Sequence, residues 1–197
     1  MTHLLFVDMT QGGLAVLKRA VECGYAVTFV RNRSVQWFYP DREYDEALRR
    51  CVQVIDVADT SNAEELTPVV SEVHSERYID GVIGNYDPAQ EAIAIACERV
   101  GVRFASPEGI ANVRDKSRIR GLLSERQLLS TSFAVVRDVR EALDVASSTG
   151  YPVVVKPVYG MGSIEAHRVD TSSQLAATVG AMLENGSAPE YLLSRKM

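Results

Sequence analysis

The sequence predicts an α/β protein in which a doubly wound parallel sheet is followed by a smaller α+β unit. Two observations indicate this class. Short apolar runs alternate with longer segments of helical periodicity in the first half of the chain, which is typical of a parallel sheet with helices on both faces. After Ser106-Pro107 the spacing of these segments changes. We therefore expect two domains, over residues 1–105 and 106–197.

Strands of the first domain are expected where apolar, β-branched residues form short runs. These runs are His3–Val7, Ala26–Val30, Val52–Val57, Gly81–Gly84 and Val102–Ala105. Helices are expected up to Glu22, over Ala63–His74 and up to Val100. Gly24 is well suited to end the first helix because glycine readily takes a positive φ. Asp87 and Pro88 suit the N-cap and the first position of the last helix.

The second domain is expected to begin with a short helical segment opened by Ser106-Pro107, and Asp115–Arg126 is expected to continue as helix. Shorter strands and two further helices follow it. The expected strands are Thr131–Val136, Val153–Lys156, Glu165–Val169 and Tyr191–Ser194, and the expected helices are Val139–Ser148 and Ser172–Leu183.

Composition excludes several classes of function. The net charge of −5 argues against a general binder of nucleic acid or anionic membranes, since such surfaces need excess Lys and Arg. Cys23, Cys51 and Cys97 are widely spaced, so neither a disulfide framework nor a zinc site is expected. Met1–Phe6 lacks the character of a signal peptide, and no apolar run reaches bilayer length. A cytoplasmic protein is expected.

The segment Tyr151–Ser163 carries the strongest chemical signal. A β-branched strand, Val153–Val155, ends in Lys156, and a lysine in such a place is costly to bury without an anionic partner. Gly160 and Gly162 follow, and glycines let backbone N–H groups approach phosphate oxygens closely. Taken alone, the segment also fits a hairpin with a flexible tip and a lysine whose stem covers apolar surface.

A second signal is Asp115-Lys116, 40 residues before Lys156. On a helix, Lys116 shares a face with Ile119 and Leu123, which would place its ammonium group at the edge of a cavity. An ion pair or a lysine lying along apolar surface fits equally well. Basic residues are in local excess here, and they suit either a small anion or a solvated helix face. They are Arg114, Lys116, Arg118, Arg120 and Arg126.

The order of these pieces resembles the ATP-grasp superfamily, in the carboxylate–amine ligase and biotin-carboxylase-like group. The resemblance spans essentially the whole chain. It implies a Rossmann-like pre-ATP-grasp domain over 1–105 and an N-terminal ATP-grasp subdomain over 106–197. It also implies ATP and Mg²⁺ as cofactors. Nucleotide phosphates would be bound by Lys116, Lys156 and the loop Gly160, Met161, Gly162 and Ser163.

The resemblance implies an enzyme that joins a small-molecule carboxylate to an amine through an acyl phosphate. Amino-acid ligation is favoured, while biotin-dependent carboxylation and other amide synthesis remain open. In the family, the magnesium ligands lie beyond the position of Met197, and an acid usual near the last strand is absent from Tyr191–Met197. We therefore expect an incomplete, truncated fragment that is inactive alone and has no catalytic or metal residues of its own. An unpaired strand edge would favour a homodimer.

Two alternatives come from other classes. The first is a non-catalytic nucleotide-binding or interaction module. The second is a nicotinamide-dependent oxidoreductase, suggested by Gly12-Gly13 after the first strand but disfavoured because the third glycine of the dinucleotide fingerprint is missing. Asn85–Asp87 is a weak substrate-site candidate at a strand end, and the aromatic cluster Trp37–Pro40 is attributed to packing.

Overall fold

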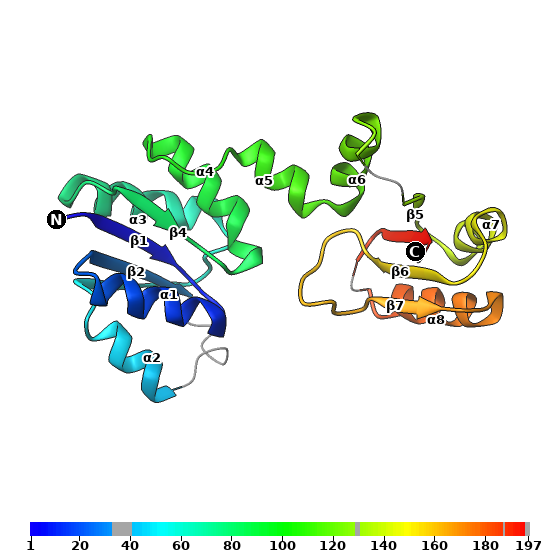
Figure 1. Cartoon of the computed structure of the whole chain (residues 1–197), viewed down its shortest axis with the longest axis horizontal. Coiled ribbons are helices and arrows are strands. Elements are labelled where there is room, and N and C mark those ends of the chain that lie inside the picture. The colour runs from blue at the N-terminus through cyan, green and yellow to red at the C-terminus, as the bar shows by residue number, and fades with distance from the viewer. Residues whose placement is uncertain (33–40, 129–130, 187, 196–197) are drawn as a thin grey trace. The chain divides into compact units, whose positions relative to one another are not determined.

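The computed structural model describes residues 1–32, 41–128, 131–186 and 188–195. The chain forms two compact units, Met1–Ile110 and Ala111–Met197. The first unit contains a parallel sheet and the second an antiparallel one (Figure 1). The aromatic cluster Trp37–Pro40 lies outside the described residues.

The sheet of the first unit has four parallel strands in the order β3-β2-β1-β4. This confirms the α/β class with a parallel sheet. The strands are β1 (His3–Val7), β2 (Ala26–Asn32), β3 (Gln53–Val57) and β4 (Gly81–Ile83). The helices are α1 (Gln11–Glu22), α2 (Asp41–Leu48), α3 (Ala63–Glu76), the 3₁₀ turn η2 (Asp87–Ala89) and α4 (Gln90–Val100).

Two hydrophobic clusters lie on this sheet, one on each face. Leu5 and Val7 of β1 pack with residues of α3 and α4, including Leu66 and Ile93. Phe6, between them, belongs to the other cluster with residues of α1 and α2. Because successive side chains of a strand point to opposite faces, the two pairs of helices cover opposite faces of the sheet (Figure 1).

Three local expectations differ from the structure. Helix α2 was not predicted. The strand expected at Val102–Ala105 is wrong, because this segment has no regular secondary structure. Gly101, at φ 82°, ends α4, and the Val102 N–H then donates to the Cys97 carbonyl at 2.9 Å instead of to a neighbouring strand. Asp87 opens the η2 turn and does not cap it, since Tyr86 holds the capping position.

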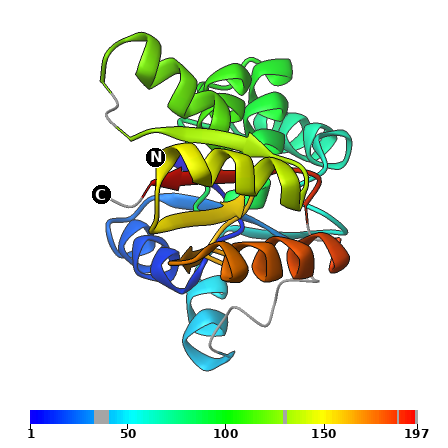
Figure 2. The ribbon, with the colours of Figure 1, turned by 90° about the vertical axis from the view of Figure 1, so that its right-hand side faces the viewer.

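The second unit contains an antiparallel sheet in the order β5-β8-β6-β7. Helices α7 and α8 lie side by side against it (Figure 2). The strands are β5 (Phe133–Val136), β6 (Val153–Pro157), β7 (His167–Val169) and β8 (Tyr191–Arg195). Helix α5 (Pro107–Arg114) spans the boundary between the two units. The other helices are α6 (Lys116–Glu125), α7 (Val139–Thr149) and α8 (Ser172–Glu184).

One face of this sheet is buried against helices α7 and α8. Val153 and Val155 of β6 belong to the hydrophobic cluster formed with α7 and α8. Residues between them in sequence point to the opposite face. That second face carries Val154 and Lys156 of β6, with Leu192 directly opposite Lys156 on β8. The alternation of side chains along β6 therefore places Lys156 away from the core helices.

Candidate functional site

Lys156 lies near the carboxyl end of β6, on the face opposite α7 and α8, and is half-buried. Burial lowers the pKa of its ammonium group, and the positive charge of Arg120 lowers this pKa further. Within the described part of the chain, the structure gives Lys156 neither an acidic partner nor a hydrogen-bond acceptor. A lysine held in this way is suited to an anion that arrives from outside.

Arg120 of α6 supplies the neighbouring positive charge. Its side chain is half-buried, and its Nη1 atom is buried without a hydrogen-bond partner among the described residues. Sequence reasoning included Arg120 in the basic run but did not select it as a site residue. The available signal was its spacing, because residues four apart share a helix face and Lys116 lies four residues earlier.

Lys116 begins α6, and Asp115 is the N-cap of this helix. The Asp115 carboxylate accepts hydrogen bonds from the backbone N–H groups of Ser117, at 2.8 Å, and Arg118, at 3.0 Å. Burial alone would raise the pKa of Asp115, but the hydrogen bond from the Ser117 hydroxyl, these two backbone bonds and the charge of Arg118 outweigh it, and the pKa is lowered. The capped helix start thus fixes where the Lys116 side chain emerges.

The Lys116 side chain reaches the segment that follows β6. Its Nζ atom donates to the carbonyl oxygens of Val158, at 3.1 Å, and Gly160, at 3.2 Å. The Lys116 backbone N–H also donates to the Val158 carbonyl at 3.3 Å. These contacts join the start of α6 to the first residues of the glycine loop. Lys116 is thus in specific contact with that loop, and its expected position at the edge of a cavity stays a prediction.

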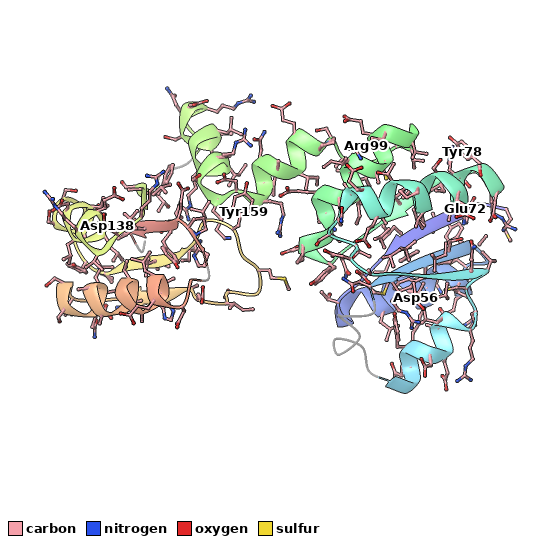
Figure 3. The ribbon with its side chains drawn as sticks, turned by 180° about the vertical axis from the view of Figure 1, so that it is seen from behind. Asp56, Glu72, Tyr78, Arg99, Asp138 and Tyr159 are labelled. Atoms are coloured by element: carbon pink, nitrogen blue, oxygen red, sulfur yellow. The ribbon has the colours of Figure 1, made fainter. Side chains whose placement is uncertain are left out.

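The loop between β6 and β7 contains the other predicted binding residues. Figure 3 shows Tyr159 at its start. Gly160, Gly162 and Ser163 are exposed, and Met161 is half-buried. Gly162 has a φ of 62°, whereas Gly160 is not among the glycines with positive φ. A positive φ therefore requires glycine at Gly162 only, and the expected close approach of both glycines to phosphate oxygens stays a prediction.

The predicted residues are thus brought together in part. Lys116 contacts Gly160, and the charge of Lys156 lies close to Arg120, four residues further along the helix from Lys116. Two backbone hydrogen bonds lie within the loop tip. The Ile164 N–H donates to the Met161 carbonyl and the Ala166 N–H to the Ser163 carbonyl, each at 3.2 Å. A direct contact of Met161, Gly162 or Ser163 with either lysine is not observed in the described residues.

Gly13, suspected of belonging to a dinucleotide site, has a packing role. A Cβ atom at this position would lie 2.5 Å from Nδ2 of Asn85. Asn85 in turn accepts a hydrogen bond from the Thr10 N–H at 2.9 Å. Close approach to the Asn85 side chain therefore explains the glycine without a nucleotide. Asn85 itself joins the ends of β1 and β4.

Asp8 was missed by the sequence reasoning. It is fully buried at the carboxyl end of β1 and has a φ of 35°. Its carboxylate accepts hydrogen bonds from the Asn32 N–H, at 2.9 Å, and from the Thr60 hydroxyl. A buried carboxylate needs such partners. Through these two hydrogen bonds Asp8 links β1 to Asn32 at the end of β2 and to Thr60 in the segment after β3.

The described residues contain no cluster of three or more His, Cys, Asp or Glu side chains that could hold a metal ion. None of their helices is both long enough and apolar enough to cross a bilayer. Cys23, Cys51 and Cys97 are all free thiols in the structure.

Comparison with known families assigns each part of the chain separately. Residues 17–102 match the ATP-grasp N-terminal domain. Residues 115–195 match the ATP binding domain of the carbamoyl-phosphate synthase L chain. The second match contains Lys116, Lys156 and the whole glycine loop.

The large chain of carbamoyl phosphate synthase from Thermotoga sp. strain RQ2 is 35% identical over 92 residues. This match covers 47% of the present chain and 8% of the relative. Among solved structures, L-amino acid ligase from Bacillus licheniformis has a TM-score of 0.76 at 21% identity, covering 100% of this chain and 44% of that one. The chain therefore spans less than half of these proteins.

A second solved structure is the biotin carboxylase domain of Hydrogenobacter thermophilus 2-oxoglutarate carboxylase, described in complex with MgADP, ADP and bicarbonate. It has a TM-score of 0.72 at 16% identity, and the likeness covers 98% of this chain and 44% of that one. At these identities the two structures establish the fold.

Proposed function

Because the chain belongs to the ATP-grasp superfamily, we propose that it takes part in the ATP-dependent joining of a small carboxylate to an amine. In this proposal residues 1–105 form the pre-ATP-grasp domain and residues 106–197 the first ATP-grasp subdomain. The observation that carries it is the half-buried Lys156, which projects beside α6 and has no anionic partner in the described residues.

The nucleotide would be held by Lys116, Lys156 and the loop of Gly160, Met161, Gly162 and Ser163. Lys156 supplies positive charge on the face of the sheet opposite α7 and α8. Lys116 holds the loop at Gly160, and the exposed residues that follow offer backbone N–H groups for phosphate oxygens. These groups neutralise charge on the transferring phosphoryl, which is how phosphoryl-transfer enzymes chiefly lower the barrier.

Bound ATP would supply the phosphoryl group that turns the carboxylate into an acyl phosphate. The residues of this chain would bind and orient the nucleotide and would not act as acids or bases. Magnesium is part of the proposal as a companion of the nucleotide, but the described residues offer no site for it. The substrates are proposed to be small molecules, with an amino acid favoured, and the location is proposed to be cytoplasmic.

Calorimetric titration of the full chain with ATP and Mg²⁺ tests the binding part of this proposal. Lys156→Ala should weaken binding roughly tenfold or more, because hydrogen bonds to charged groups contribute about 1.5–3 kcal/mol. Lys18→Ala is the matched control, since Lys18 pairs with Glu43 in the other unit. A folded wild-type chain that does not bind ATP would contradict the proposal.

Formation of the proposed acyl phosphate is tested by chemical trapping. Hydroxylamine converts an acyl phosphate into a stable hydroxamate, so the chain is incubated with ATP, Mg²⁺ and a panel of amino acids. Hydroxamate that forms only with ATP and one class of acid supports ligation and names the carboxylate. ATP binding without hydroxamate from any acid would argue for a nucleotide-binding module that lacks the reaction.

A further inference from the structure

Arg120 and Lys156 form a pair of neighbouring positive charges. Arg120 comes from α6 and Lys156 from β6, and both side chains are half-buried. Neither has an acidic partner or a hydrogen-bond acceptor in the part of the chain that the structure describes. Such an arrangement is unfavourable, because like charges repel and a buried N–H without an acceptor loses its hydrogen bond to water.

The nearby acid on α6 does not neutralise this pair. The Asp115 carboxylate already accepts from the Ser117 hydroxyl, at 2.6 Å, and from two backbone N–H groups at the start of the helix. Exposed Arg118 contributes the charge that interacts with Asp115. Arg120 and Lys156 therefore remain available for an anion with several acceptor oxygens.

We propose that Arg120 is a phosphate-binding residue that acts together with Lys156 on the polyphosphate of the nucleotide. This rests on the proposed nucleotide-binding function. A phosphoryl group supplies what both side chains lack, because it carries negative charge and can accept hydrogen bonds from a guanidinium and an ammonium at once. An arginine is suited to this task, since its planar fork presents several N–H donors in a fixed geometry.

Lys116 and Arg120 then have different tasks although they lie one helical turn apart. The ammonium group of Lys116 donates to the carbonyls of Val158 and Gly160, so it positions the loop. The buried Nη1 atom of Arg120 has no such acceptor among the residues that the structure describes. Loss of Lys116 should act through the loop, whereas loss of Arg120 should act directly on affinity for phosphates.

The test uses Arg120→Met, which keeps much of the aliphatic stem, with Arg118→Met as the control. Arg118 is an exposed arginine on the same helix, so the control removes the same charge. Calorimetry with ATP, ADP and adenosine, each with Mg²⁺, should show roughly tenfold weaker binding of ATP and ADP to Arg120→Met. Adenosine should bind the two variants equally. Arg120→Lys should restore part of the affinity.

Thermal unfolding without nucleotide separates binding from a structural role. Arg120→Met should unfold at the same temperature as wild type or higher, because it removes repulsion on Lys156. Weaker ATP binding together with a clearly lower unfolding temperature would overturn the proposal, as would equal ATP affinity in Arg120→Met and wild type. A wild type that binds no ATP would instead overturn the proposed function on which this inference rests.

Discussion

The ammonium group of Lys116 donates a hydrogen bond to the carbonyl oxygen of Gly160, 44 residues later in the chain. A second bond from the same atom reaches the Val158 carbonyl. The loop after β6 is thus tied to the first residue of α6. A side chain expected to contact a ligand therefore also fixes the start of the loop that would cover it.

Replacing Lys116 with Met should loosen this loop. Both side-chain bonds to Val158 and Gly160 would be lost, while the backbone bond from residue 116 to the Val158 carbonyl would remain. Hydrogen exchange followed by mass spectrometry should show faster exchange in Tyr159–Ser163. Lys18→Met is the control. Unchanged exchange in the loop would show that these bonds do not hold it.

Gly162 and Gly160 should respond differently to alanine. Gly162 has a φ of 62°, which costs a residue with a Cβ atom about 1–2 kcal/mol. At Gly160 an added Cβ would meet Pro157 at 3.6 Å, an ordinary contact. Denaturant unfolding should therefore show a loss of about 1 kcal/mol for Gly162→Ala and little change for Gly160→Ala. Equal effects would contradict the loop conformation.

Gly13 and Gly12 offer a second matched pair, in α1. An alanine Cβ at Gly13 would lie 2.5 Å from Asn85 Nδ2 and 2.6 Å from the Met9 Cβ. Overpacking of this kind costs about 1–3 kcal/mol. At Gly12 the nearest atom is 3.9 Å away, so alanine should be neutral or slightly stabilising in the helix. Denaturant midpoints of both variants check this, and a tolerated Gly13→Ala would count against the Asn85 contact.

Stability should depend on pH through Lys156. The pKa of this lysine in the folded chain lies below its ordinary 10.5 because of burial and Arg120. Above the folded pKa the native state therefore binds fewer protons than the unfolded chain. The free energy of unfolding should rise as the pH increases from the folded pKa towards 10.5.

Denaturant unfolding at several alkaline pH values measures this contribution as the difference between wild type and Lys156→Met. The rise should be small because the side chain is only partly buried. Arg120→Met should reduce it further by removing one of its two causes. Identical pH curves for wild type and Lys156→Met would show that the lysine is not destabilised in the fold.

Local patterns predicted the sheet of the first unit and the position of Lys156. Apolar runs predicted β1 to β4, and the β-branched run Val153–Val155 predicted a strand that Lys156 closes. Helix α2 was missed because Asp41–Leu48 is largely polar, although Tyr44, Ala47 and Leu48 are buried and follow helical spacing. The spacing of residues in the sequence cannot show that so short an apolar helix face will pack against the sheet.

Long-range pairings could not be predicted in this way. The contact between Lys116 and Gly160 depends on how α6 docks, and the buried hydrogen bonds of Asp8 depend on segments far along the chain. Arg120 was visible as one of several basic residues, but its sequence does not tell which of them is buried. Only the fold distinguishes half-buried Arg120 from exposed Arg118.

The strand order β5-β8-β6-β7 has a consequence for synthesis on the ribosome. The central strand β8 (Tyr191–Arg195) lies between two strands made earlier, so β5 and β6 have no shared neighbour until β8 has been translated. The four strands of the first unit all precede Gly84, and domains generally fold as they emerge, N-terminal first. The nascent chain can thus form the parallel sheet of the first unit before β8 has been added to the antiparallel sheet that carries Lys156.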